Sequence, residues 1–264
     1  MLLKRITSSV ILILLTLGTI FIDWLCGIFI SLIIILGLYE YFKMLENKGI
    51  TIYKYFGMAI GALVPLSIVF RFELTRSWEL FFVVLGMLFL ILMQLRRRQN
   101  SGAVVGISTT IFGILYISWF FSFLIKIRYL PSGIGLLSAL LLITKSGDIG
   151  AYLVGSRFGK IPLIPSISPH KSLEGSLVGL LSSILAAVAS RPLLHLGYLH
   201  LIFVGFFFGI LAQLGDLSES LIKRDCQVKD SGKIIPGIGG ILDLIDSLLF
   251  TAPVFYFYIN IILK

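Results

Sequence analysis

The sequence is dominated by long apolar runs separated by short segments that carry most of its charges. The runs are close in length to the about 20 residues that a helix needs to cross a bilayer. Runs such as Val10–Ile22 and Ile28–Leu38 are continuous, whereas the strands of a porin-type barrel alternate apolar and polar residues. The pattern therefore predicts an all-α integral membrane protein.

Composition excludes the other classes. Hydrophobic residues make up 58% of the 264 residues, charged residues only 13%, and the mean hydropathy is +1.03. Soluble globular chains carry about 25% charged residues, and disordered chains need low hydrophobicity with high charge. A water-soluble fold and a disordered chain are both excluded, and the lipid bilayer is the expected environment.

The apolar runs predict a polytopic helical bundle of about nine transmembrane helices. The predicted spans are 7–22, 24–42, 55–70, 79–95, 103–125, 133–153, 174–190, 193–215 and 241–262. With the N-terminus in the cytoplasm, most of the 22 Lys and Arg fall in cytoplasmic segments, as the positive-inside rule requires. That rule also accounts for the net charge of +9, so we expect no nucleic-acid partner.

The same count divides the chain into two regions. Residues 1–130 hold about five spans, and residues 131–264 hold about four spans. We expect the chemistry in the second region, whose cytoplasmic loops are residues 155–173 and 217–240. Ser172 is placed to cap the helix that follows it, and Gly175 and Gly179 have the spacing that lets helices pack closely.

Acidic residues inside or beside the spans are the strongest functional signal, because each costs about 2.5–3.5 kcal/mol or more to insert. Asp216 follows one predicted span, and Asp243 and Asp246 begin the next on one helical face. Carboxylate oxygens are ligands that Mg²⁺ prefers, so these three aspartates form a candidate metal site. A structural salt-bridge network is the alternative. Lys145 and Asp148, three residues apart, are either functional or a tolerated buried ion pair.

The predicted loop 217–240 is basic and rich in glycine. It contains Lys223, Arg224, Lys229 and Lys233 and four glycines. Such a loop can turn its backbone N–H groups and its cations toward a phosphate. A loop that only retains membrane orientation is the alternative. With the 155–173 loop and the carboxylates, it predicts a metal–phosphate site at the membrane surface.

Residues 220–246 resemble a known signature. The matching segments are Ser220–Arg224, Lys229–Gly232 and Pro236–Asp246. Together they resemble the long signature of the phosphatidate cytidylyltransferases, and the resemblance covers about residues 140–250. Two positions depart from it: Ile238 stands where the signature has His, and Leu244 where it has Arg.

The resemblance implies an enzyme that converts CTP and phosphatidic acid to CDP-diacylglycerol and pyrophosphate with Mg²⁺, at the cytoplasmic side of the bacterial inner membrane. It implies metal-binding and catalytic roles for Asp216, Asp243 and Asp246, and catalytic roles for Lys223 and Lys229. The substrate-binding residues that it implies are Lys171, Ser220, Arg224, Asp230, Gly239 and Gly240. A second cation and a homodimer are left open.

Three other functions compete with this one. In a transporter or channel for an anionic solute, Lys145 and Asp148 would bind the solute, but the sequence lacks the inverted repeats of such proteins. The signature of the CDP-alcohol phosphotransferases, another class of lipid-phosphate enzyme, is absent. A catalytically silent membrane scaffold is the third alternative, which the changes at Ile238 and Leu244 keep open.

Overall fold

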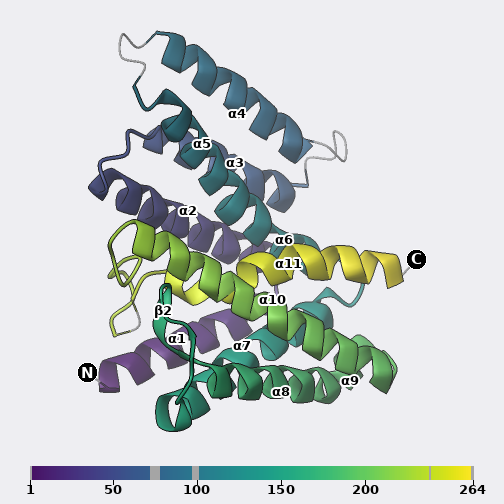
Figure 1. Cartoon of the computed structure of the whole chain (residues 1–264). Helices are drawn as coiled ribbons and strands as arrows, with labels where there is room; N and C mark the ends of the chain where they lie inside the picture. The colour runs from purple at the N-terminus through teal and green to yellow at the C-terminus, as the bar shows by residue number, and fades with distance from the viewer. Residues whose placement is uncertain (1, 72–77, 97–100, 238, 263–264) are drawn as a thin grey trace. The chain divides into compact units, whose positions relative to one another are not determined.

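A computed structural model describes residues 2–71, 78–96, 101–237 and 239–262, which are almost entirely helical (Figure 1). The α-helices in chain order are α1 Leu2–Ile20, α2 Asp23–Asn47, α3 Lys54–Val69, α4 Trp78–Leu95, α5 Ala103–Gly113, α6 Phe120–Arg128, α7 Gly133–Phe158, α8 Leu173–Ala189, α9 Arg191–Leu194, α10 Tyr198–Asp225 and α11 Leu242–Ile262. A π-helical segment, η1 Ile114–Trp119, joins α5 to α6, and two short strands, β1 Pro162–Ile164 and β2 Ser168–Ser172, precede α8.

An apolar helix lies at each predicted span. Among the described residues, five helical segments are long and apolar enough to cross a membrane: α2, the continuous α5–η1–α6 segment, α7, α10 and α11. Four shorter apolar helices occupy the other predicted positions, within α1, α3, α4 and α8. The prediction of an all-α membrane protein is therefore confirmed, whereas the number of crossings and the side of the N-terminus stay predictions.

The structure adds regular secondary structure within both of the predicted cytoplasmic loops. The predicted loop 155–173 contains an antiparallel pair of strands, in which Pro162 pairs with Ser172. The predicted loop 217–240 is helical as far as Asp225, because α10 begins at Tyr198 and continues well past the apolar run. Hydropathy locates the part of a helix that suits lipid, but polar residues can continue the same hydrogen-bonded helix into water.

The chain forms two compact units. Unit 1 consists of residues 1–126 and 226–243, and unit 2 consists of residues 127–225 and 244–264. The basic loop between α10 and α11 thus belongs to unit 1, although both helices belong almost entirely to unit 2.

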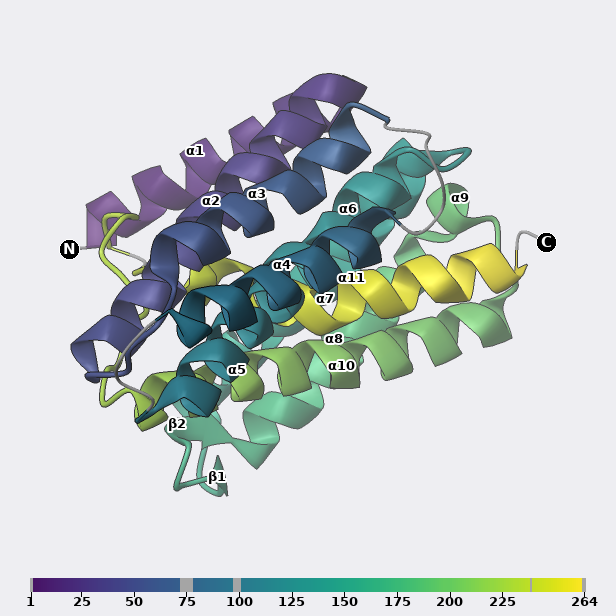
Figure 2. The ribbon, with the colours of Figure 1, turned by 90° about the horizontal axis from the view of Figure 1, so that it is seen from above.

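Unit 1 packs its helices through small residues. Helices α1, α2 and α3 run side by side (Figure 2), and α3 also packs against η1 and α4. Gly57 and Gly61 of α3 face Phe42 and Leu38 of α2 so closely that a Cβ at Gly61 would lie 2.3 Å from the Leu38 side chain. Ser118 of η1 donates a hydrogen bond to the carbonyl oxygen of Gly61.

Unit 2 is built around α8, which packs against both α7 and α10 (Figure 1). Gly175 and Gly179 of α8 approach the backbone of α7, so the predicted close packing at these glycines is confirmed. From α10, Gly205 and Gly209 approach α8 around Ser183. Close backbone approach of this kind is how helices associate in lipid, where no hydrophobic driving force acts between them.

Gly205 gives a direct test of this packing. A Cβ there would lie 2.4 Å from the Cα of Ile184, which is backbone and cannot rotate away. We expect Gly205→Ala to lower the free energy of unfolding by about 1–3 kcal/mol, measured by thermal unfolding of the purified protein in detergent. Gly18→Ala in α1 is the matched control, because nothing lies within 4 Å of its Cβ position. Equal midpoints for the two variants would contradict the packing.

Candidate functional site

The C-terminal half of α10 presents a row of functional side chains from unit 2. Asp216, Glu219, Ser220 and Lys223 are spaced at three- and four-residue intervals, so they share one face of the helix. Glu219 and Ser220 are buried, and Asp216 and Lys223 are partly exposed. The helical extension beyond the predicted span is therefore what places these residues together.

Each of the two acidic residues in this row is paired with a lysine. The Asp216 carboxylate lies 2.6 Å from Nζ of Lys171, which is supplied by β2. Glu219, whose side chain is fully buried, forms an ion pair with Lys223 one turn later in α10. Breaking a buried ion pair by removing one partner is costly, because a buried charge is left uncompensated.

The β-hairpin that carries Lys171 is fixed at both of its sides. Nε of Arg224 donates a hydrogen bond of 3.2 Å to the carbonyl oxygen of Ile167 in the hairpin turn. Ser172 ends β2 and accepts a 3.1 Å hydrogen bond from the backbone N–H of Gly175, so its predicted capping of α8 is confirmed. These contacts orient Lys171 toward α10.

Lys145 of α7 joins two helices of unit 2. Its Nζ donates to Oδ2 of Asp148 at 2.9 Å, to Oγ of Ser247 at 2.8 Å and to the carbonyl oxygen of Leu244 at 3.0 Å. An ammonium group has three N–H donors, so all three are used. Ser247 donates in turn to Asp148 at 2.9 Å. The predicted Lys145–Asp148 pair therefore exists and ties α7 to α11.

Asp246 of α11 is a buried carboxylate of unit 2 with several charged groups around it. It is 8% exposed, and Gly215 of α10 lies so close to its backbone that a Cβ there would be 2.4 Å from the Asp246 carbonyl oxygen. The charged groups that act on its carboxylate are Asp216, Lys145, Asp148 and Glu219. Several carboxylates close together repel one another, so this arrangement favours binding of a cation, alone or together with a phosphate that carries it.

In unit 1, one carboxylate organises the basic loop. Oδ2 of Asp243 accepts hydrogen bonds from the backbone N–H of Ser231 at 3.0 Å, its hydroxyl at 3.0 Å and the N–H of Gly240 at 2.8 Å. Gly239 has a φ of +135°, which disfavours any side chain. We call residues 226–241 the signature loop, because most of the resembling segment lies in it.

A second carboxylate reaches this loop from α2, and the sequence analysis missed it. Glu40 is 2% exposed, and its Oε2 accepts hydrogen bonds from the N–H of Leu242 at 3.0 Å and from the hydroxyl of Ser231 at 3.1 Å. The signal that could have found Glu40 is its position inside the predicted span 24–42, where an ionisable residue calls for a function.

The predicted site residues thus fall into two groups. Those in unit 2 are Lys171, Asp216, Ser220, Lys223, Arg224 and Asp246. Those in unit 1 are Lys229, Asp230, Gly239, Gly240 and Asp243. Lys229 and Asp230 are exposed, whereas Gly240 is buried. The departure at Ile238 lies outside the described residues.

Metal binding by these carboxylates stays a prediction. Within the described part of the chain, no group of three or more His, Cys, Asp or Glu side chains is arranged to hold a metal ion. The donor chemistry nevertheless suits a hard cation, because Asp216 and Asp246 offer carboxylate oxygens that act on each other electrostatically.

The comparisons with known proteins agree with the resemblance seen in the sequence. Residues 3–262 match the model of the cytidylyltransferase family. The chain belongs to this family. This cytidylyltransferase is 34% identical to the phosphatidate cytidylyltransferase of Synechocystis, over 98% of this chain and 97% of that protein. It is also 34% identical to the phosphatidate cytidylyltransferase of Bacillus subtilis, over 87% of each chain, and to the uncharacterized protein YnbB of Escherichia coli, over 90% of this chain and 80% of that protein.

One departure of this cytidylyltransferase from the signature has a structural counterpart. Leu244 stands where the signature has Arg, and the cation found beside Leu244 is Lys145, bonded to its carbonyl oxygen. Lys145 also acts electrostatically on Asp246 and Asp216. A positive charge therefore lies beside the carboxylates of unit 2 although residue 244 itself is apolar.

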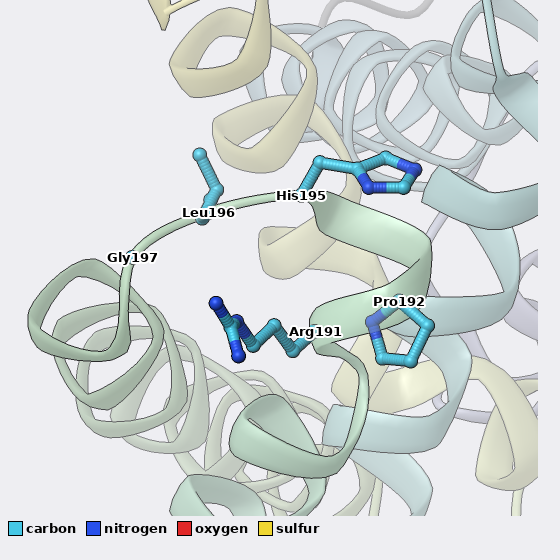
Figure 3. Close-up of a pocket in the computed structure, with 5 residues that line it drawn as sticks. All are labelled: Arg191, Pro192, His195, Leu196 and Gly197. Carbon is cyan, nitrogen blue, oxygen red and sulfur yellow. The ribbon is translucent and has the colours of Figure 1, made fainter.

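A surface pocket elsewhere in unit 2 does not share this chemistry. It is lined by Arg191, Pro192, His195, Leu196 and Gly197, in α9 and the loop after it (Figure 3). It lies at the opposite end of α8 from the Lys171 hairpin, and no acidic residue lines it. The guanidinium of Arg191 donates to the hydroxyl of Tyr198 at 2.8 Å. We do not assign the site to this pocket.

The Lys145 network predicts non-additive effects on stability. Lys145→Met leaves Asp148 without its ammonium partner, so we expect it to lower the free energy of unfolding by about 1–3 kcal/mol. Adding Asp148→Asn removes the stranded charge and should recover about 0.5–3 kcal/mol. Unfolding of the single and double variants in detergent measures this coupling, and strictly additive losses would show that the pair does not interact.

Proposed function

We propose that this protein transfers the cytidylyl group of CTP to phosphatidic acid, giving CDP-diacylglycerol and pyrophosphate in phospholipid biosynthesis. The observation that carries the proposal is the match to the cytidylyltransferase family over residues 3–262, together with near full-length relatives named phosphatidate cytidylyltransferase. The paired lysines and carboxylates of unit 2 support it, because a phosphate-transfer site needs both cations and metal-binding oxygens.

We also propose that the protein lies in the bacterial inner membrane and crosses it nine times, with its N-terminus and its site on the cytoplasmic side. The nine apolar helical segments and the excess of Lys and Arg on one side of the predicted topology support this orientation. It gives the site access to CTP from the cytosol and to the phosphate of a lipid whose head group lies at the same interface.

The proposed reaction needs no covalent intermediate with the protein. A phosphate oxygen of phosphatidic acid attacks the α-phosphorus of CTP, a new P–O bond forms, the bond between the α-phosphorus and the bridging oxygen breaks, and pyrophosphate leaves with that electron pair. The protein contributes by orienting the substrates and neutralising charge. Lys171, Lys223, Arg224 and Lys229 supply positive charge for the phosphates, and Ser220 and Asp230 supply hydrogen-bonding groups. Gly239 and Gly240 contribute through the shape of the loop, because their N–H groups already donate to the Ile235 carbonyl oxygen and to Oδ2 of Asp243.

We propose Mg²⁺ as the metal, held by Asp216 and Asp246, with Asp243 one turn before Asp246 in α11. Mg²⁺ commonly uses one or two carboxylates together with substrate phosphates, so two aspartates suffice for this role. When bound, the ion would neutralise charge on the reacting phosphates.

The transporter hypothesis is weakened by the Lys145–Asp148 pair. All three ammonium donors of Lys145 are used within the protein, so none is left for an anionic solute.

A homodimer also stays a proposal. Gly205 and Gly209 have the spacing that could join helices of two copies, but they pack against α8 within the chain. The mass of the protein–detergent complex would decide the oligomeric state.

The activity itself is tested with radiolabelled CTP and phosphatidic acid in proteoliposomes. We expect labelled CDP-diacylglycerol from the wild type, none with EDTA, and a loss of about 10²–10³-fold in kcat for Asp246→Asn and Asp216→Asn, because charge stabilisation in the transition state is removed. Asp243→Asn should also lose activity, since Asp243 accepts three loop hydrogen bonds. Asp23→Asn is the control, because Asp23 is an exposed residue at the start of α2, where it forms an ion pair with Arg71, and it is not among the proposed site residues. A wild type that makes no product with any metal would refute the proposal.

The topology is tested by cysteine accessibility. The native Cys26 and Cys226 are both buried and outside any disulfide, so replacing them with Ser gives a clean background. Single cysteines at Lys171 and Lys229 should react with a membrane-impermeant maleimide only in inside-out vesicles, because both positions are expected in the cytoplasm. Labelling of the two positions from opposite sides would contradict the nine-span arrangement.

A further inference from the structure

Glu40 connects the N-terminal helices to the signature loop. It lies in α2, 191 residues before Ser231, and it is the most deeply buried acidic residue of unit 1 among those described. Its burial in an apolar helix carries a large cost unless the carboxylate is well satisfied. Among the described residues, its hydrogen-bond donors and the glycines that approach it belong to the signature loop or to the start of α11.

The Glu40 carboxylate acts on both ends of the loop. The N–H of Leu242 is one of the amides at the N-terminus of α11 that have no partner within the helix, and it donates to Oε2 of Glu40 at 3.0 Å. The hydroxyl of Ser231 lies between Oε2 of Glu40 at 3.1 Å and Oδ2 of Asp243 at 3.0 Å. Glu40 and Asp243 therefore hold the first part of the loop against the start of α11.

Two glycines of the loop leave room for this carboxylate. A Cβ at Gly232 would lie 2.1 Å from Oε1 of Glu40, and its three nearest atoms would all belong to the Glu40 side chain. A Cβ at Gly240 would lie 2.4 Å from Oε2 of Glu40 and even closer to the hydroxyl of Ser231. Neither glycine has a positive φ, so Gly232 is required by the space that Glu40 occupies, and Gly240 by the space that Glu40 and the Ser231 hydroxyl occupy together.

One oxygen of Glu40 has no hydrogen-bond partner. Oε1 is buried and faces Gly232, and no donor reaches it among the described residues. Leaving a buried acceptor unsatisfied costs about 1–3 kcal/mol, and such groups in native proteins call for an explanation.

We propose that Glu40 is a positioning residue of the cytidylyltransferase reaction. It holds the signature loop in the conformation in which Asp243 is fixed and the exposed Lys229 and Asp230 are presented to substrate. The role rests on the proposed function, because Lys229 and Asp230 of the loop are among the residues that we assign to the substrate phosphates. Glu40 acts through Ser231, Leu242 and the two glycines and does not itself contact the reacting atoms.

The test compares three substitutions at Glu40 by kcat and KM for CTP, normalised to folded protein. Glu40→Gln keeps the shape and an oxygen acceptor for Leu242, so we expect activity close to the wild type. Glu40→Ala removes the acceptor. Glu40→Asp shortens the side chain by one methylene and so moves the acceptor away from Leu242 and Ser231. We expect each substitution to lower kcat/KM by up to about 100-fold, as small misplacements of catalytic groups do. Glu46→Ala is the matched control on α2, since Glu46 is exposed and pairs only with Lys54.

A double-mutant cycle with Gly232 tests the contact itself. Gly232→Ala should lower both activity and the unfolding midpoint, because its methyl group overlaps Glu40. In the Glu40→Ala background the same methyl group has room, so the double variant should be no worse than Glu40→Ala alone. Purely additive losses would overturn the contact. If Glu40→Ala does not fold, the comparison of Glu40→Asp with Glu40→Gln decides the positioning role.

The outcomes also separate this inference from the proposed function. If the wild type makes no CDP-diacylglycerol, the proposed function fails and the positioning role fails with it. If the wild type is active and folded Glu40→Ala and Glu40→Asp turn over like Glu46→Ala, the positioning role alone is wrong. Reduced yield with unchanged kcat for the folded fraction would likewise mean that Glu40 only stabilises the fold.

Discussion

A carboxylate inside an apolar helical bundle must find its cation or its hydrogen-bond donors within the protein, because lipid offers neither. This constraint explains how the charged side chains of unit 2 are paired. Asp148 meets Lys145 and Ser247, Asp216 meets Lys171, and Glu219 meets Lys223. Each pair joins neighbouring turns or separate elements, so satisfying the charges also fixes α7, α10, α11 and the β-hairpin of unit 2 in their arrangement.

The two units use the signature residues in different ways. In unit 2 the polar residues of α10 lie on a rigid helix, where their spacing alone puts them on one face. In unit 1 the same signature continues as a loop whose shape depends on two carboxylates. Asp243 and Glu40 accept hydrogen bonds from backbone N–H groups of the loop and the start of α11, and from the Ser231 hydroxyl. We propose phosphate chemistry for the lysines of the signature, whereas Gly232 is explained by the volume of a carboxylate from another helix and Gly240 by that carboxylate together with the Ser231 hydroxyl.

Much of the fold could be predicted from hydropathy, and much less of the site. Apolar runs located every long helix, because burial in lipid acts on each segment separately. The ends were less predictable: α10 continues to Asp225 because a helix that has already formed can include polar residues at little cost. The strand pairing of Pro162 with Ser172 was missed, since two strands of a few residues each leave no periodic pattern. Glu40 was missed because the signature covers residues 220–246 and its partner lies in α2.

The sequence by itself determined the membrane class, the helical segments, the resemblance to the cytidylyltransferases and the residue types of the site, since these follow from composition, local spacing and motif. Only the tertiary structure decided which charges neutralise one another and which side chain shapes the signature loop. Lys145 could have paired with Asp148 alone, yet it also bonds Ser247 and the carbonyl oxygen beside the changed signature position. The physical reason is that ion pairs and steric exclusion act over a few ångströms in space, and sequence separation does not limit which residues come that close.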